Sequence, residues 1–362
     1  MTRIVTFGEI MGRLTPPGFI RLRQGLPGSL DVSFAGAEAN VAASLSFFGA
    51  DATFVTALPN NELADACIAM LQATGMGCHI IRADYGRLGL YFLETGANQR
   101  PSRVIYDRDQ SSISLTASQT YDWQSIFAGA AWFHVTGITP ALSQAAAEAT
   151  IDAVKLAKEM GLTVSCDLNF RGKLWRWEDS VKPRELAGRV MRDVLPHVDV
   201  LIANEEDCGD VLGIRATGVD HHSGQLDVAR YPDVARQVVR EFPNITRVAT
   251  TLRESISASH NNWGAMLFDV TADRAYFAPR SGEDYQPYEI RNIVDRVGGG
   301  DAFAAGLIFA LTHADYDEPQ QALDFAVAAS CLAHSVRGDF NFCSRAEVDA
   351  LVGGSGSGRV VR

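Results

Sequence analysis

Short apolar runs alternate along the chain with longer segments in which apolar residues recur every three or four positions. The short runs predict buried strands, and the longer segments predict amphipathic helices. The predicted strands lie at 4–7, 53–57, 132–135, 162–166, 198–202 and 247–251. The predicted helices lie at 37–48, 61–74 and 143–160, and three more begin at Asp301, Gln320 and Arg345. This alternation predicts an α/β fold with a mostly parallel sheet and helices on both of its faces.

Two stretches interrupt the alternation. Residues 11–34 are rich in Gly and Pro, and residues 88–118 have the pattern of a hairpin with its turn at 96–101. We expect the two insertions to form a small β-sheet lid that stands off the core, and an edge hairpin of the main sheet is the alternative. Residues 1–10, 35–87 and 119–352 would then form the α/β core, and residues 353–362, rich in Gly and Ser, a flexible tail.

Residues 295–301 read Asp-Arg-Val-Gly-Gly-Gly-Asp and are followed directly by an apolar helical run. Gly298, Gly299 and Gly300 free the backbone at a point where unpaired helix N–H groups and the positive end of the helix dipole converge. Such a turn is typical of a phosphate site. The carboxylate of Asp301 would repel a phosphate, so it needs another role, and accepting a proton from an attacking hydroxyl is one.

The structural alternative is a plain glycine turn in which Asp301 caps the helix. Two other phosphate motifs do not fit the stretch. A Walker A loop would continue with Gly-Lys-Ser or Gly-Lys-Thr, and a dinucleotide fingerprint would stand at the first βα turn.

Composition narrows the classes of ligand. The formal net charge of −11 argues against nucleic acid or an anionic membrane as the main partner. An anionic ligand therefore needs locally placed Arg, Lys or N–H groups. The six cysteines are scattered without a Cys-x-x-Cys pair, and neither a signal peptide nor a membrane-spanning stretch is apparent, so we expect a protein of the reducing cytoplasm.

Two motifs together resemble those of the ribokinase-like (pfkB) carbohydrate kinases, and the resemblance covers essentially the whole chain. Residues 295–301 stand where that family has Asp-Thr-x-Gly-Ala-Gly-Asp, and residues 35–42 where it has Gly-Gly-x-x-x-Asn-x-Ala. Tyr106-x-Arg108, Asp167-x-Asn169-x-Arg171 and the stretch 334–341 resemble the branch that phosphorylates 2-keto-3-deoxygluconate. The resemblance implies a three-layer α/β/α core with a small lid sheet and the activity of an ATP-dependent sugar kinase.

The resemblance also implies roles for the reacting groups. Asp301 accepts the proton of the terminal hydroxyl of the sugar, while the N–H groups of the three glycines hold charge that develops on the γ-phosphate. Mg²⁺ bridges the ATP phosphates and is steered through water by Asn204 and Asp207. Asp207 stands where the family has Glu, and the neighbouring Glu206 is an alternative. The nucleotide-binding residues expected after the strands and at the glycine turn are Asn204, Thr251, Arg253, Gly298 and Gly300.

A keto-deoxy sugar acid carries a carboxylate, which needs a local cation in so acidic a chain. Arginine holds a carboxylate through two parallel hydrogen bonds, and Arg108 and Arg171 are the candidates. Spacing alone leaves open that they instead pair with Asp107 and Asp167. The other residues expected around the sugar are Gly36, Asn40, Tyr91 and Tyr106.

Several functional alternatives remain open. A kinase of the same family could act on a neutral sugar such as ribose or fructose, or on a nucleoside, and a sugar-binding regulator without catalysis is a more remote alternative. An oxidoreductase would need an early Gly-x-Gly-x-x-Gly, which the sequence lacks. No residue distinguishes a gluconate-type from a galactonate-type substrate. The unpaired edges of a lid sheet predict a homodimer formed through the lids.

Overall fold

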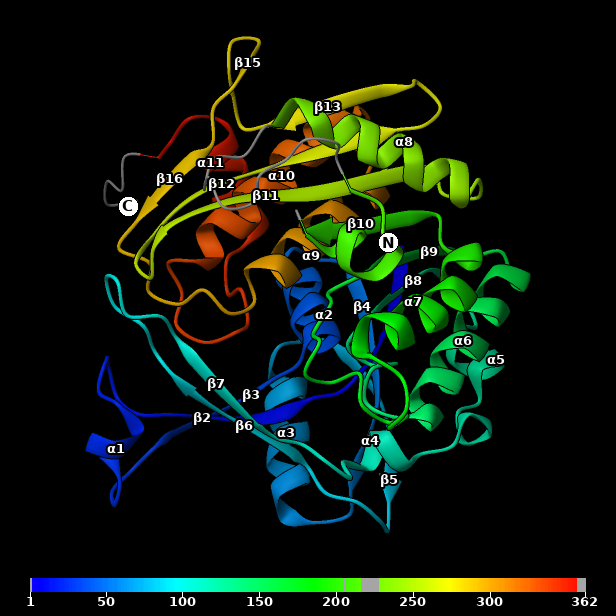
Figure 1. Cartoon of the computed structure of the whole chain (residues 1–362), viewed down its shortest axis with the longest axis vertical. Coiled ribbons are helices and arrows are strands. Elements are labelled where there is room, and N and C mark those ends of the chain that lie inside the picture. Colours follow the sequence, from blue (N-terminus) through cyan, green and yellow to red (C-terminus); the bar gives the residue numbers. More distant parts are fainter. Residues whose placement is uncertain (1, 205, 216–227, 357–362) are drawn as a thin grey trace.

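The main element is a ten-stranded sheet with one antiparallel edge (Figure 1). The computed structural model describes residues 2–204, 206–215 and 228–356. Seven of its strands, β11, β10, β9, β8, β1, β4 and β5 in sheet order, run parallel to one another as predicted, whereas β12 pairs antiparallel with β11, β13 and β16. The order is β13 (Arg274–Ala278), β12 (His260–Asp269), β11 (Arg247–Ser257), β10 (Val200–Asn204), β9 (Thr163–Asp167), β8 (Ala130–Thr136), β1 (Arg3–Phe7), β4 (Asp51–Pro59) and β5 (Gly77–Ala83), with β16 (Tyr288–Arg291) on β12.

Helices cover both faces of this sheet and enclose two separate hydrophobic cores, so the predicted three-layer α/β/α architecture is confirmed. Adjacent residues of one strand, such as Leu201 and Ile202, contribute to different cores, as the alternation of side chains along a strand requires. One core includes α4 (Ser112–Leu115), α5 (Trp123–Ile126), α6 (Gln144–Glu159), α7 (Pro183–Val194) and α8 (Tyr231–Glu241). The other includes α2 (Ala37–Phe47), α3 (Glu62–Ala73), α9 (Gly299–Thr312), α10 (Pro319–Ala333) and α11 (Arg345–Val352).

A second, four-stranded sheet stands beside the core, at the lower left of Figure 1. Its order is β3 (Asp31–Ala35), β2 (Met11–Thr15), β6 (Gly89–Glu94) and β7 (Arg103–Asp107), and the short helix α1 (Leu22–Gly25) lies between β2 and β3. The predicted hairpin is formed by β6 and β7. The small sheet is thus confirmed, whereas the exact division of the chain into core and lid remains a prediction. After β7 the chain returns to the core, where α4 packs against α6 and β4.

Several elements differ from the sequence-based expectations. α3 begins at Glu62, one residue later than predicted, because Asn61 is its cap and accepts the N–H of Ala64 through its side chain. The strand that begins at Arg247 extends to Ser257. A two-stranded hairpin of β14 (Arg280–Ser281) and β15 (Asp284–Tyr285) projects from the antiparallel edge. Of the predicted tail, residues 357–362 lie outside the described residues.

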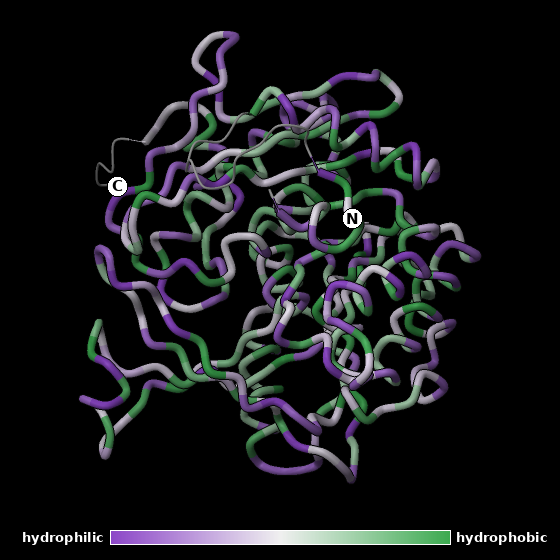
Figure 2. Tube along the Cα trace, in the orientation of Figure 1, coloured by the Kyte–Doolittle hydropathy of each residue, from purple (hydrophilic) through white to green (hydrophobic). Residues whose placement is uncertain are grey.

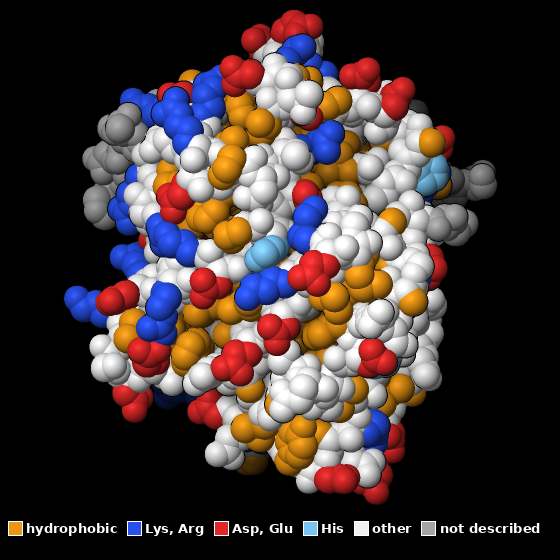
Figure 3. All heavy atoms as spheres, turned by 90° about the vertical axis from the view of Figure 1, so that its right-hand side faces the viewer, with side chains coloured by type: hydrophobic (Ala, Val, Ile, Leu, Met, Phe, Trp, Pro, Cys, Tyr) orange, Lys and Arg blue, Asp and Glu red, His pale blue; other side chains and the backbone are white. Residues whose placement is uncertain are grey.

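The distribution of polarity follows this architecture. In Figure 2 hydrophobic segments run through the middle of the molecule, and further hydrophobic segments lie in the lid, away from both cores. The face in Figure 3 intersperses acidic, basic and apolar side chains. In the part of the chain that the structure describes, no helix is long and apolar enough to cross a membrane.

Candidate active site

One pocket of about 440 Å³ lies where the carboxyl ends of the parallel strands meet the start of α9 and the lid sheet. Ligands of open parallel sheets bind at this edge. Every site residue predicted from the sequence lines the pocket: Gly36, Asn40, Tyr91, Tyr106, Arg108, Arg171, Asn204, Asp207, Thr251, Arg253, Gly298, Gly299, Gly300 and Asp301. The structure therefore brings these residues together, and their individual roles remain predictions.

The glycine turn forms the amino-terminal end of α9. Gly298 is the N-cap and has a φ of +85°, a conformation that favours glycine. A Cβ at this position would lie only 2.2 Å from the carbonyl oxygen of Asp339. The first N–H groups of a helix have no partner within it, and the helix dipole is positive there. The turn is therefore built to face an anion.

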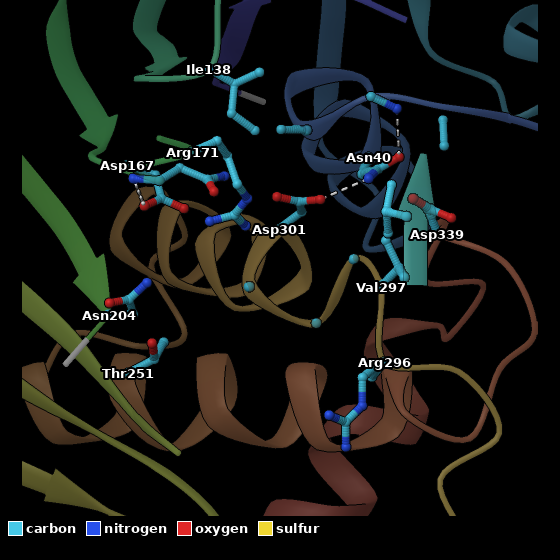
Figure 4. A pocket seen from close by; sticks show the side chains of 18 of the residues that line it. Asn40, Ile138, Asp167, Arg171, Asn204, Thr251, Arg296, Val297, Asp301 and Asp339 are labelled. Carbon is cyan, nitrogen blue, oxygen red and sulfur yellow. Dashed lines mark hydrogen bonds between the residues drawn. The ribbon is translucent and has the colours of Figure 1, made fainter. Parts of the chain in front are cut away.

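Asp301 lies in the first turn of α9 and is 8% exposed. Its Oδ2 accepts a hydrogen bond of 2.7 Å from Asn40 Nδ2 (Figure 4), and Asn40 Oδ1 accepts the N–H of Gly36 at 3.2 Å. Burial raises the pKa of Asp301 to about 6, although the hydrogen bond from Asn40 lowers it. Asp301 is thus ionised at neutral pH yet more basic than an ordinary aspartate, which suits a general base.

A second carboxylate lies beneath the start of α2. Glu38 is buried, and its Oε1 accepts hydrogen bonds from the hydroxyls of Thr136, at 2.7 Å, and Thr139, at 2.9 Å. Burial raises the pKa of Glu38 to about 7. These bonds attach the helix that carries Asn40 to the end of β8, so the donor to Asp301 is held on a fixed element.

Asn204 and Asp207, the residues expected near a metal ion, fold back on the backbone. The carboxylate of Asp207 accepts the N–H groups of Phe170, at 3.2 Å, and Asn204, at 3.1 Å, while Asn204 Oδ1 accepts the N–H of Asp207 at 3.0 Å. Within residues 2–204, 206–215 and 228–356 there is no group of three or more His, Cys, Asp or Glu side chains that could hold a metal ion. The side chains of Asn204 and Asp207 therefore fit a metal ion that keeps most of its bound water.

Arg108 and Arg171 differ in their surroundings. Arg108 is buried and forms an ion pair with Glu9, which follows β1, while Asp107 pairs with Arg87 at 2.9 Å. The alternative in which Arg108 pairs with Asp107 at the surface is therefore wrong. Arg171 is exposed and extends toward Asp167 and Asp301 (Figure 4), and burial raises the pKa of Asp167.

The hydroxyl of Tyr91 donates to Asp339 Oδ2 at 2.8 Å, and the role of Tyr91 toward a sugar remains a prediction. One expectation about a neighbouring strand needs correction. Thr251 and Arg253 lie within β11 and do not follow it, because the hairpin with β12 continues the strand beyond the pocket.

Sequence reasoning missed several charged residues that line the pocket or lie beside it. Arg296, which replaces the family threonine, donates to the carbonyls of Ser257 and Ala258 and lies on the far side of the glycine turn from Asp301 (Figure 4). Arg13 of the lid forms ion pairs with Asp295 and Asp339. For the cluster of Arg13, Asp295 and Asp339, the one signal in the sequence was that Asp295 belongs to the glycine motif.

The chain is similar to known proteins over nearly its whole length. The model of the pfkB family carbohydrate kinases matches residues 1–346. A 2-dehydro-3-deoxygalactonokinase from Haloferax volcanii is 32% identical to this chain, and the alignment covers 98% of each chain. A 2-dehydro-3-deoxygluconokinase from Thermoproteus tenax is 29% identical, and the alignment covers 94% of this chain and 90% of the other. The solved structure of the 2-dehydro-3-deoxygluconokinase from Thermotoga maritima shares 45% identity with a TM-score of 0.87, covering 98% of this chain and 100% of that one.

Proposed function

Because the chain belongs to the pfkB family of carbohydrate kinases, we propose that it transfers the γ-phosphate of ATP to the terminal hydroxyl of a keto-deoxy sugar acid. The first candidate is 2-keto-3-deoxygluconate, also called 2-dehydro-3-deoxygluconate, with the 6-phosphate as the product. The observation that carries the proposal is the buried carboxylate of Asp301 beside the N–H groups of the glycine turn, in a pocket that also contains Arg108 and Arg171.

In the proposed reaction the protein supplies position and charge. Asp301 accepts the proton of the sugar hydroxyl while that oxygen attacks the γ-phosphorus. Asn40 holds the carboxylate in place through its 2.7 Å hydrogen bond. The N–H groups at the start of α9 stabilise the negative charge on the transferred group, since they already point at the place where it develops.

The carboxylate of the substrate is assigned to the two arginines. Arg108 uses one terminal nitrogen for Glu9, and its Nε has no hydrogen-bond partner, so N–H groups remain for a ligand. Arg171 follows β9 and extends into the same pocket (Figure 4). Such a pair suits an acid better than a neutral sugar. Tyr106, Gly36 and the apolar body of Tyr91 complete the proposed sugar site.

ATP and Mg²⁺ are the proposed co-substrate and ion. Asn204 and Asp207 would hold water of the magnesium ion, which neutralises phosphate charge when it is bound. Thr251 and Arg253 line the nucleotide side of the same pocket. The six cysteines form no disulfide, which fits the reducing cytoplasm that we propose as its compartment.

We further propose a homodimer formed through the lid sheets. Four apolar side chains lie side by side across the outer face of the lid, because the register pairs Val32 with Leu14, Leu14 with Phe92 and Phe92 with Ile105. Val32 is 61% exposed and Ile105 55%. An exposed apolar face of this kind on a sheet with free edges favours pairing with a second copy.

The proposal is tested by measuring ADP release with ATP and Mg²⁺ on a panel of 2-keto-3-deoxygluconate, its galactonate epimer, ribose, fructose and adenosine. We expect turnover on the keto-deoxy acids, and the ratio of kcat/KM for the two epimers then shows which of them the enzyme prefers. A preference for ribose or fructose would retain the kinase chemistry and overturn the carboxylate assignment. Sugar binding without phosphorylation of any substrate would instead support the regulator.

A further inference from the structure

We propose that Arg13 is a positioning residue that holds the glycine turn in its phosphate-binding form and neutralises two carboxylates beside it. The inference rests on the proposed function, because it concerns how the same pocket binds a nucleotide. It assigns a role to a lid residue that neither approaches the reacting atoms nor belongs to the glycine motif.

The hydrogen bonds of Arg13 use each nitrogen of its guanidinium group. Nη1 pairs with Asp339, Nη2 pairs with Asp295, and Nε donates to Thr15 Oγ1 at 3.1 Å. Arg13 is 3% exposed, and both acids are also buried. Removing one partner of a buried ion pair destabilises a protein more than removing one partner of an exposed pair, because the remaining buried charge stays uncompensated.

The two acids are connected to the glycine turn by separate contacts. Asp295 Oδ1 accepts the N–H of Val297 at 3.2 Å, one residue before the turn. The backbone carbonyl of Asp339 lies so close to Gly298 that a Cβ there would meet it at 2.2 Å. Asp295 Oδ2 also accepts the N–H of Gly338 at 3.3 Å, which ties the two segments together. Arg13 thus fixes both sides of the place where the positive φ of Gly298 begins the helix.

Charge gives Arg13 a second effect. Although its burial opposes a charged form, the two carboxylates raise the pKa of Arg13 above its ordinary value, so it is a permanent cation. Without it, two buried carboxylates would stand next to a turn that must hold the phosphates of a nucleotide, and they would repel them. The other titratable groups near this cluster are Tyr91, Asp301 and His334.

The lid contacts this cluster through two strands. Arg13 of β2 is directly paired with Tyr91 of β6, and the hydroxyl of Tyr91 also donates to Asp339. The same lid face carries Tyr106, which lines the sugar side of the pocket. The position of the lid over the sugar and the shape of the phosphate turn are therefore set by one cluster of charges.

The test is direct binding of ADP, by calorimetry with Mg²⁺ and without sugar, to the wild type, Arg13→Met and Arg13→Lys. At pH 8 we expect Arg13→Met to bind ADP about tenfold or more weakly. Arg13→Lys keeps the positive charge but cannot bond both carboxylates as the guanidinium does, so its affinity for ADP should lie between those of the wild type and Arg13→Met.

Two further variants separate this role from general damage to the lid. Arg100→Met removes another lid arginine, which pairs with Glu94 at 3.7 Å and donates to the carbonyl of Phe19, and it should leave ADP binding unchanged. If Arg13→Met does not fold, the double variant Arg13→Met with Asp339→Asn leaves one uncompensated carboxylate fewer, and its affinity for ADP should lie close to that of the wild type.

Equal ADP affinity of wild type and Arg13→Met, or of Arg13→Met and the double variant, overturns the proposal. Because the measurement needs no sugar and no turnover, a wrong assignment of the substrate would not affect it. Failure of the sugar panel and failure of this inference are therefore distinguishable.

Discussion

At the scale of single residues, Asp301 has the surroundings of a general base, and its replacement tests that role. Asp301→Asn keeps the size of the side chain but accepts no proton, so kcat should fall by about two to four orders of magnitude. ADP affinity and the unfolding temperature should stay near those of the wild type. Steady-state kinetics combined with thermal unfolding measures both, and a less than tenfold loss of kcat would exclude Asp301 as the base.

The hydrogen bond from Asn40 makes a separate prediction for the pH dependence. Protonated Asp301 cannot accept the hydroxyl proton, so kcat should rise with pH through the pKa of about 6. Because the Asn40 bond lowers that pKa, Asn40→Ala should move the rising limb to higher pH. The profile of kcat from pH 5 to 8 reports the shift, and a limb that stays in place would contradict it.

The residues that sequence analysis located and those that it missed differ in how far along the sequence their partners lie. Asp301 and the three glycines were located because a short motif contains both the turn and the carboxylate. The partners of Arg13 lie 282 and 326 positions away, and no spacing rule selects them among the 43 acidic residues. The pairing of Glu9 with Arg108 likewise depends on how the lid sits over the core.

At the scale of elements, two glycines of one turn should respond oppositely to alanine. Gly298→Ala places a Cβ at positive φ and against the Asp339 carbonyl, so it should destabilise the fold by about 1–3 kcal/mol or more. Gly300→Ala is the matched control, because its Cβ would meet no atom within 4 Å, and in a helix it should stabilise by about 0.5–1 kcal/mol. Denaturant unfolding measures both, and equal effects would refute the account of the turn.

The inner parallel strands of the main sheet could be predicted because they are buried on both faces and therefore appear as continuous apolar runs. The edge strand β5 was missed, since most of its residues are only partly buried. The helices α7 and α8 were missed because they bury only one face, and most of their other residues are charged or polar. The extension of β11 and its antiparallel partner β12 were also missed. The second half of β11 carries exposed polar residues such as Arg253 and Ser255, and their sequence lacks the apolar pattern that predicts a strand.

At the scale of the whole molecule, the proposed dimer predicts which surface substitution changes the assembly. Ile105→Lys, on the outer face of the lid, should convert the dimer to monomers, because a charge would be buried between two apolar faces. Leu63→Lys alters a similarly exposed apolar residue on α3 and should leave the assembly unchanged. Sedimentation velocity distinguishes the two, and a wild type that sediments as a monomer would refute the dimer itself.

The ion pairs of Arg13 join the beginning of the chain to its end, and this has a consequence for synthesis. A ribosome adds about 5–20 residues per second, so Arg13 emerges roughly 15–65 s before Asp339. During that interval the first lid strand lacks its ion pair to Asp339. The nucleotide site is therefore completed only when the last tenth of the polypeptide is translated, and a message that ends before that point encodes a lid without this contact.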